Sequence, residues 1–193
     1  MDLEIRGAGN LLGAEQSGQL GAVGYETYME LLEEAVSDLR GKQRELVVDP
    51  EIRLGIPARL PESYVADVSQ RLVLYKRLAS APNEAEADRL RDELLDRFGP
   101  LPREAENLLA VIRLKIAARS LGIAQVLLDG PDLVFTAAPT TRVDPAKLHA
   151  LVTRRRSDLR VMPDHRIRTA VRDREPSALF ARARQVLTEL GAA

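Results

Sequence analysis

A glycine-rich run near the start of the chain carries residues that could bring backbone close to a ligand or to another backbone. Residues 6–24 hold six of the twelve glycines of the chain. Glycine has no Cβ atom and reaches positive-φ conformations, so its backbone can approach a bound group closely. Three leucines in the run supply apolar anchors that a plain linker would lack. We therefore predict a structured loop, and its candidate functional residues are Arg6, Gly7, Gly9, Gly13, Gln16, Ser17 and Gly18.

A row of arginines nearer the C-terminus is the second candidate surface. Side chains alternate between the two faces of a strand, so Arg166, Arg168, Arg172 and Arg174 are expected to point the same way. Such a row suits docking of an acidic protein or of DNA, and it equally suits a solvated sheet face. No aromatic residues interleave with these arginines, which argues against single-strand binding by base stacking.

Several catalytic chemistries lack the residues that they need. The chain has no cysteine, which excludes disulfides and thiolate chemistry and makes a reducing compartment, the cytoplasm, the expected location. His149 and His165 stand apart without carboxylates at ligand spacing, so we predict no metal site. The sequence lacks the GxxxxGK[ST] loop that holds ATP, and its glycine run does not match the dinucleotide fingerprint. We expect no catalytic residue, no cofactor and no enzymatic activity in this chain alone.

The composition favours a folded domain with an uneven charge distribution. Hydrophobic residues make up 45% of the chain and charged residues 30%, which is enough for a core under a well-solvated surface. No apolar run approaches the length of a membrane span, so no membrane partner is expected. The net charge of −1 hides a basic segment at residues 142–184, with twelve Arg or Lys against five Asp or Glu. This split favours an acidic or nucleic-acid partner, or a dipolar surface with no partner.

Hydrophobic periodicity places these residues on an α+β framework. Residues 1–6 alternate as a short strand and would be a poor start for an independent domain, so we expect more protein upstream. Apolar residues at helical spacing, with stop and cap signals at Gly41, Asn83 and Gly122, define the first helices. These predicted helices span residues 25–40, 62–81, 83–98 and 102–122. Proline-broken residues 45–60 read as an extended segment at a sheet edge or in a crossover.

After Gly122 the period changes to that of strands. A hairpin is predicted around Asp129-Gly130, although Pro131 argues against a simple two-residue loop. Asp144 followed by Pro145 is typical of a helix start, and Pro176 opens the last helix. The predicted elements here are strands at 123–128, 133–137, 159–162 and 166–172 and helices at 145–155 and from 176. We therefore predict an arm over residues 1–44 and, over residues 45–193, a domain of about five helices on a small, mostly antiparallel sheet.

The pattern RGxGxxLGxxQSG at residues 6–18 resembles the translocation motif shared by the RecG branch-migration helicase and the transcription-repair coupling factors (Mfd). The resemblance continues through residues 25–36 and resumes at 71–81 and at 95–102. These later stretches resemble only the coupling factors, because RecG ends soon after the motif. The chain thus resembles the C-terminal part of a coupling factor.

That resemblance implies a function for the whole protein. A coupling factor is an ATP-driven translocase on double-stranded DNA that removes stalled RNA polymerase and recruits UvrA for nucleotide-excision repair. ATP and Mg²⁺ would bind in motor lobes that this chain lacks. The family's C-terminal domain has no catalytic groups and masks the N-terminal UvrA-binding module, so that module is the expected intramolecular partner.

Arg6 and Gln16 keep two interpretations. By the resemblance, the motif lies against the second motor lobe and relays nucleotide state to duplex DNA, and a guanidinium suits such a joint. In the structural interpretation, Arg6 pairs with Glu15 or with loop carbonyls while Gln16 pins the turn. Two other functions also stay open: a DNA-binding module that uses the arginine row, and a self-association domain. The second would use apolar residues left uncovered at Leu3, Ile5, Leu11, Leu12 and Leu20.

Overall fold

The computed structural model describes residues 48–154, 158–162, 164 and 166–192. The chain divides into two compact units, Met1–Lys42 and Gln43–Ala193, and all described residues belong to the second. The predicted strand at 1–6, the glycine-rich loop and the predicted helix at 25–40 lie outside the described residues. They stay predictions, as does the proposed boundary between residues 44 and 45.

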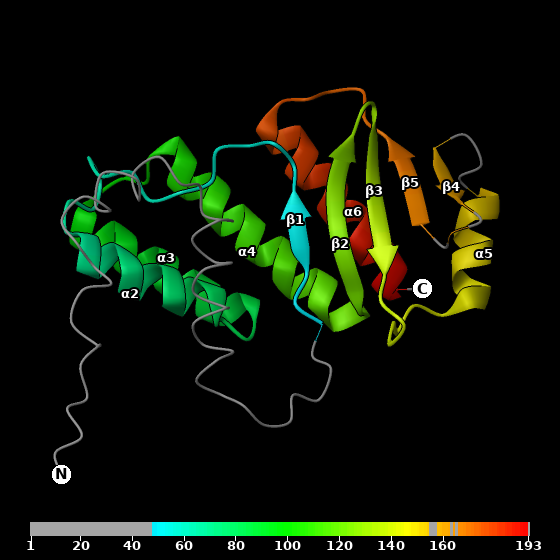
Figure 1. The fold of residues 1–193 in the computed structure, drawn as a ribbon, viewed down its shortest axis with the longest axis horizontal. Coiled ribbons are helices and arrows are strands. Elements are labelled where there is room, and N and C mark those ends of the chain that lie inside the picture. Colours follow the sequence, from blue (N-terminus) through cyan, green and yellow to red (C-terminus); the bar gives the residue numbers. More distant parts are fainter. Residues whose placement is uncertain (1–47, 155–157, 163, 165, 193) are drawn as a thin grey trace, which may run out of the picture. The chain divides into compact units, whose positions relative to one another are not determined.

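Three helices form a helical region in the first half of the described domain (Figure 1). They are α2 (Val68–Ala79), α3 (Glu84–Phe98) and α4 (Arg103–Leu121). The predicted start of α3 is confirmed, because Asn83 Oδ1 accepts a hydrogen bond from the Glu86 N–H at 3.0 Å, as expected of an N-cap. Gly122 ends α4 in the left-handed conformation with φ 67°, also as the sequence predicts.

The prediction for α2 was wrong at its start and only partly right on its buried face. The helix begins at Val68, because Asp67 Oδ1 accepts from the Gln70 N–H at 2.7 Å and caps it there. Residues 61–65 instead form a turn in which the Tyr64 and Val65 N–H groups donate to the Pro61 carbonyl. Apolar spacing along residues 62–81 predicts a buried stripe of Val65, Val68, Leu72, Tyr75 and Ala79. Val65, which precedes the helix, is buried, and Leu72, Tyr75 and Ala79 are half-buried. The helix residues that are buried are Leu74 and Leu78, whereas Val68 is exposed.

One five-stranded sheet combines a strand that precedes these three helices with four strands that follow them. Its strands are β1 (Glu51–Arg53), β2 (Ile123–Asp129), β3 (Asp132–Ala137), β4 (Leu159–Val161) and β5 (Arg166–Ala170). Their order across the sheet is β1-β2-β3-β5-β4 (Figure 1). Only the β1–β2 pair is parallel, so the predicted α+β fold with a mostly antiparallel sheet is confirmed. The proline-flanked strand β1 lies at an edge, as expected.

The β2–β3 hairpin is tighter than the sequence suggested. Asp129 pairs with Asp132, so the loop consists of Gly130 and Pro131 alone. Gly130 has φ 55°, and proline fixes a negative φ at the next position. This combination is the one that a type II′ hairpin turn requires, which explains why Pro131 does not prevent a two-residue loop.

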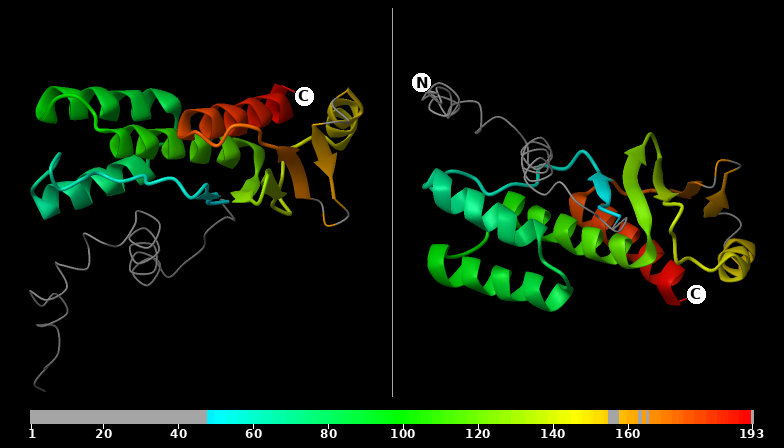
Figure 2. Two further views of the ribbon diagram at one scale, coloured as in Figure 1. Left: turned by 90° about the horizontal axis from the view of Figure 1, so that it is seen from above. Right: turned by 60° about the horizontal axis from the view of Figure 1, so that its bottom comes forward.

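Two further helices complete the domain, namely α5 (Pro145–Arg154) and α6 (Pro176–Ala192). Asp144 Oδ1 accepts from the Ala146 N–H at 2.8 Å and so caps α5 as predicted. Helices α4 and α6 pack on each other and lie on the same side of the sheet (Figure 2). Apolar spacing along the last helix predicts six buried residues. Phe180 is only half-buried, and the other five are buried, namely Leu179, Ala183, Val186, Leu187 and Leu190.

The core lies between α4, α6 and the face of the sheet that they cover. Phe135 and Ile167 are directly opposite each other on this inner face, and both are at most 2% exposed. Asp49 fastens the start of the described domain to α4, because its carboxylate lies 3.0 Å from Arg119 Nη2 and 3.6 Å from Lys115 Nζ. None of the helices in the described part of the chain is long and apolar enough to cross a membrane.

Candidate functional site

The residues of the glycine-rich motif are not part of the described domain. Arg6, Gly7, Gly9, Gly13, Gln16, Ser17 and Gly18 all lie outside the described residues. Their proposed role in translocation therefore stays a prediction. The second candidate surface, the arginine row, does lie within the described residues, except that His165 and residues 155–157 beside it are not described.

Only part of the arginine row lies on strand β5. Ile167 and Thr169 are buried on the inner face, 2% and 0% exposed, and the alternation places Arg166 and Arg168 on the opposite, outer face. The strand ends at Ala170, so Arg172 and Arg174 lie beyond it and the period-two argument does not reach them. The structure thus brings only two of the four predicted arginines together on one sheet face.

Asp132 neutralises the arginines of the outer face. Register places Arg160 of β4 opposite Arg168 of β5, an arrangement that is destabilising for like charges. The Asp132 carboxylate, whose side chain is 10% exposed, lies between them, 3.6 Å from Arg160 Nη2 and 3.7 Å from Arg168 Nη1. Arg168 also pairs with Asp129 at 2.9 Å. The outer sheet face therefore carries a network of paired charges. It does not present a continuous row of free positive charges.

Arg166 and Arg174 form hydrogen bonds to neighbouring loops. Arg166 Nε donates to Asp164 Oδ2 at 2.7 Å, and this hydrogen bond holds the pKa of Asp164 below its ordinary value. Arg174 Nη2 donates to the Gly130 carbonyl at 2.7 Å, while the Val171 N–H donates to the Pro131 carbonyl at 2.8 Å. These bonds fasten the segment after β5 to the β2–β3 hairpin.

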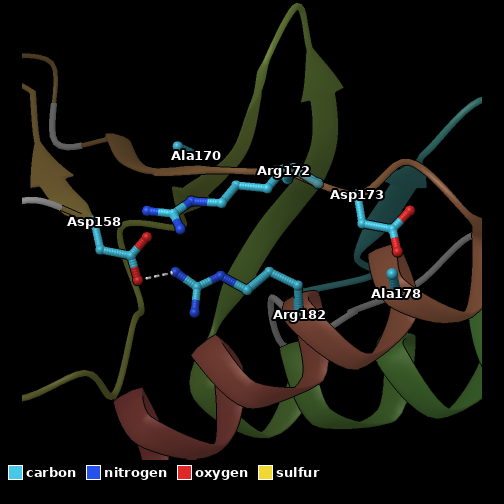
Figure 3. A pocket seen from close by; sticks show the side chains of 7 residues that line it. Asp158, Ala170, Arg172, Asp173, Ala178 and Arg182 are labelled. Carbon is cyan, nitrogen blue, oxygen red and sulfur yellow. Dashed lines mark hydrogen bonds and ion pairs between the residues drawn. The ribbon is translucent and has the colours of Figure 1, made fainter.

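Arg172 occupies a different place, in a surface hollow of about 490 Å³ between the end of β5 and the first turns of α6 (Figure 3). The hollow is lined by Arg172 together with Asp158, Ala170, Ala178 and Arg182 among others. Arg182 Nη2 donates to Asp158 Oδ2 and to Thr169 Oγ1. Sequence reasoning missed Asp158 and Arg182, because no local pattern links a residue before β4 with one on α6.

A second charge cluster lies in the helical region, where Glu93 of α3 sits between two arginines. Arg77 of α2 reaches both oxygens of Glu93, at 2.8 and 2.6 Å, and Arg97 lies 2.7 Å from it. The hydrogen bonds from Arg77 and then from Arg97 lower the pKa of Glu93. The same bond to Glu93 raises the pKa of Arg77. The Glu93–Arg97 spacing of four residues was a readable signal for this cluster.

These clusters consist of ion pairs within the domain. Among the residues that the structure describes, no group of three or more His, Cys, Asp or Glu could hold a metal ion. The arginines present fixed, planar donors that match carboxylates and phosphates. Most of them are already paired within the domain, and this limits what the outer sheet face can bind.

Comparison with known proteins gives a consistent result. Residues 54–148 match the TRCF domain family. The chain is 40% identical over 190 residues, 98% of its length, to the transcription-repair-coupling factor of Myxococcus xanthus. It is 43% identical over 156 residues, 78% of its length, to the transcription-repair-coupling factor of Escherichia coli strain K12. The chain spans only 16% and 14%, respectively, of the lengths of these two relatives.

The fold agrees with a solved structure, the crystal structure of the C-terminal domain of a transcription-repair coupling factor. The TM-score is 0.65 at 18% identity, and the match covers 75% of this chain and 92% of that one. The described residues thus form an α+β domain with the fold of a coupling-factor C-terminal domain. The chain belongs to the transcription-repair-coupling factor family, as its sequence motifs predict.

Proposed function

We propose that the whole protein is an ATP-driven translocase on double-stranded DNA that removes stalled RNA polymerase and recruits UvrA. The observation that carries this proposal is the 40% identity to a transcription-repair-coupling factor over 98% of the chain. In this proposal ATP and Mg²⁺ bind to motor lobes outside the chain. The chain supplies the translocation motif, with Arg6 and Gln16 as its relay residues, and a regulatory domain that has no catalytic group.

The regulatory domain masks the UvrA-binding module of the same protein until polymerase is engaged. A moderate interface suffices for this, because a tethered partner is present at high effective concentration. Exposed apolar side chains are available on both halves of the domain, with Val73 of α2 57% exposed and Met162 after β4 37% exposed. The network of paired charges on the outer sheet face also supports contact with a protein, since it offers few free charges to nucleic acid.

A capture assay tests the masking role. The chain is immobilised and incubated with the isolated N-terminal UvrA-binding module, with UvrA added as competitor. We expect capture of the module and its release by UvrA. Val73→Asp and Met162→Asp place one charge on each half of the domain, so the variant that abolishes capture identifies the masking face. Absence of capture, or capture that UvrA leaves unchanged, would contradict masking.

Translocation is tested in the full-length protein with Arg6→Ala. We expect retained DNA binding and loss of triplex displacement, because the substitution removes the relay and leaves the DNA-contacting lobes intact. Arg89→Ala, at a side chain that is 80% exposed, is the matched control and should displace the triplex at the normal rate. An unchanged rate in Arg6→Ala would remove the motif from the mechanism.

The described geometry gives little support to the alternative of DNA binding through the arginine row. Arg166, Arg168 and Arg174 each bond to an acceptor within the domain. A salt titration of duplex binding separates the two functions, because binding by several free arginines would fall steeply with salt. We expect no binding of a short duplex by this chain at about 50 mM salt.

A further inference from the structure

Arg172 stands out among the arginines between residues 160 and 184. The other six described arginines in this segment each form an ion pair with a carboxylate or donate to a carbonyl, namely Arg160, Arg166, Arg168, Arg174, Arg182 and Arg184. Within the described residues, no hydrogen bond or ion pair is formed by the side chain of Arg172. Arg172 is an exposed residue, and it lines the hollow beside α6.

Of the two arginines in the hollow, Arg182 is fixed by hydrogen bonds and Arg172 is not. Arg172 and Arg182 both extend toward Asp158, while Asp173 lies at the far end of the hollow (Figure 3). Arg182 is held on three sides, by Asp158, by Thr169 and by Gln185 Oε1 at 3.1 Å. Asp173 Oδ1 accepts from the Glu175 N–H at 2.9 Å. The two carboxylates therefore have partners of their own, and Arg172 is left as the donor that an incoming anion would meet.

We propose that this hollow binds the carboxylate of an Asp or Glu side chain on a partner protein, with Arg172 as the group that recognises it. A guanidinium binds a carboxylate through two parallel N–H···O bonds, which also fixes its direction. The small side chains of Ala170 and Ala178 leave room beside Arg172 for the methylene groups of an acidic residue. The site does not depend on the masking role, because any protein that presents one acidic side chain satisfies its chemistry.

A protein carboxylate suits the hollow better than a nucleic-acid backbone does. A duplex presents a row of phosphates and needs several free cations along it. Among the described residues that line this hollow, Arg172 is the only guanidinium without a partner, and the carboxylates of Asp158 and Asp173 lie on the same hollow, where they disfavour a second phosphate. The neighbouring arginines on the outer sheet face are already occupied by Asp129 and Asp132. The hollow therefore suits a single carboxylate better than it suits a row of phosphates.

The test is a nuclear magnetic resonance titration of the complete chain, labelled with nitrogen-15. The probes are the peptide Ac-Ala-Glu-Ala-NH₂, its Gln counterpart, inorganic phosphate and a short DNA duplex. We expect the Glu peptide to shift the Arg172 Nε–H and Ala178 N–H signals in a saturable manner, and the Gln peptide to leave them in place. Arg172→Gln should weaken the Glu peptide about tenfold, in line with loss of a charge-assisted bond.

Two further variants make the result specific. Arg172→Lys keeps the charge but loses the two-pronged geometry, so it should retain part of the affinity. Arg174→Gln is the matched control, since that guanidinium is bonded to the Gly130 carbonyl, and it should bind the Glu peptide like the parent chain. The proposal fails if the Glu and Gln peptides shift the same signals equally or not at all. It also fails if the duplex binds through Arg172 more tightly than the Glu peptide, since the site would then serve nucleic acid.

Discussion

The helical region and the sheet of this domain each place one carboxylate between two arginines. The two clusters differ in contact distance and in the exposure of the carboxylate. In the helical region Glu93 has short contacts of 2.6–2.8 Å to Arg77 and Arg97, and its side chain is 26% exposed. In the sheet, Asp132 has longer contacts of 3.6 and 3.7 Å to Arg160 and Arg168, and its side chain is 10% exposed. Water screens the first cluster more than the second.

The comparison leads us to expect that burial and topology outweigh contact distance in setting the stability that each cluster contributes. Side chains on α2 and α3 can turn away into solvent if Glu93 is lost, so Arg77 and Arg97 keep their hydration. Arg160 and Arg168 are opposite each other in a strand register that the backbone fixes, so they stay close whatever happens to Asp132. We therefore expect the looser contact to matter more for stability than the tighter one.

The largest expected effect is at Gly122, which joins α4 of the helical region to β2 of the sheet. In Gly122→Ala the new Cβ would lie 2.7 Å from Thr141 Cα, and the residue must keep φ +67°. Left-handed strain and overpacking together should cost about 3 kcal/mol of unfolding free energy, measured by urea denaturation. Gly130→Ala has φ +55° and open space around the Cβ, so it should cost only about 1 kcal/mol. Equal losses in the two variants would show that Thr141 yields readily.

A smaller loss is expected for Asp132→Asn. The substitution leaves Arg160 and Arg168 opposite each other with one carboxylate fewer, and we expect a loss of about 2 kcal/mol in unfolding free energy. Asp129→Asn is the matched control, because Asp129 also pairs with Arg168 but is 54% exposed, and it should cost less than about 1 kcal/mol. If Asp129→Asn costs more unfolding free energy than Asp132→Asn, burial does not determine how much each ion pair contributes to stability.

The smallest effect is expected for Glu93→Gln, at about 0.5 kcal/mol near neutral pH, because the cluster is partly exposed. The pKa of Glu93 is lowered in the folded chain, so its stabilisation is present above the ordinary value of 4.5 and disappears as pH falls through the lower folded pKa. Denaturation of both proteins from pH 7 downward should show curves that converge below pH 4.5. A difference that stays constant with pH would assign the effect to packing.

Much of this fold could be predicted from the sequence, because local signals coincide with tertiary ones. Asn83, Asp144 and Gly122 act as caps where their chemistry suggests, and the hairpin falls at Gly130. The start of α2 was missed because apolar spacing continues through Val65, whereas the cap at Asp67 decides where the helix begins. A cap is a local hydrogen bond, and the spacing of apolar residues does not reveal where it forms.

The candidate site was less predictable. Alternation along β5 correctly separated Ile167 and Thr169 from Arg166 and Arg168, but it could not show that Asp129 and Asp132 lie among the arginines. The hollow around Arg172 depends on α6 and on the residue before β4, which the sequence does not connect. Family motifs indicated the family, which residue chemistry alone could not do, because the paired charges of the described residues carry no motif of a known reaction.

The fastening of Asp49 to α4 has a mechanical consequence. The chain reaches the domain through Asp49 and then β1, which pairs with the sheet, while Arg119 and Lys115 hold Asp49 against the last turns of α4. Tension on the preceding chain would therefore be shared at once between the longest helix of the described domain and the edge of its sheet. The load would then enter the helical region and the sheet at the same point of the chain.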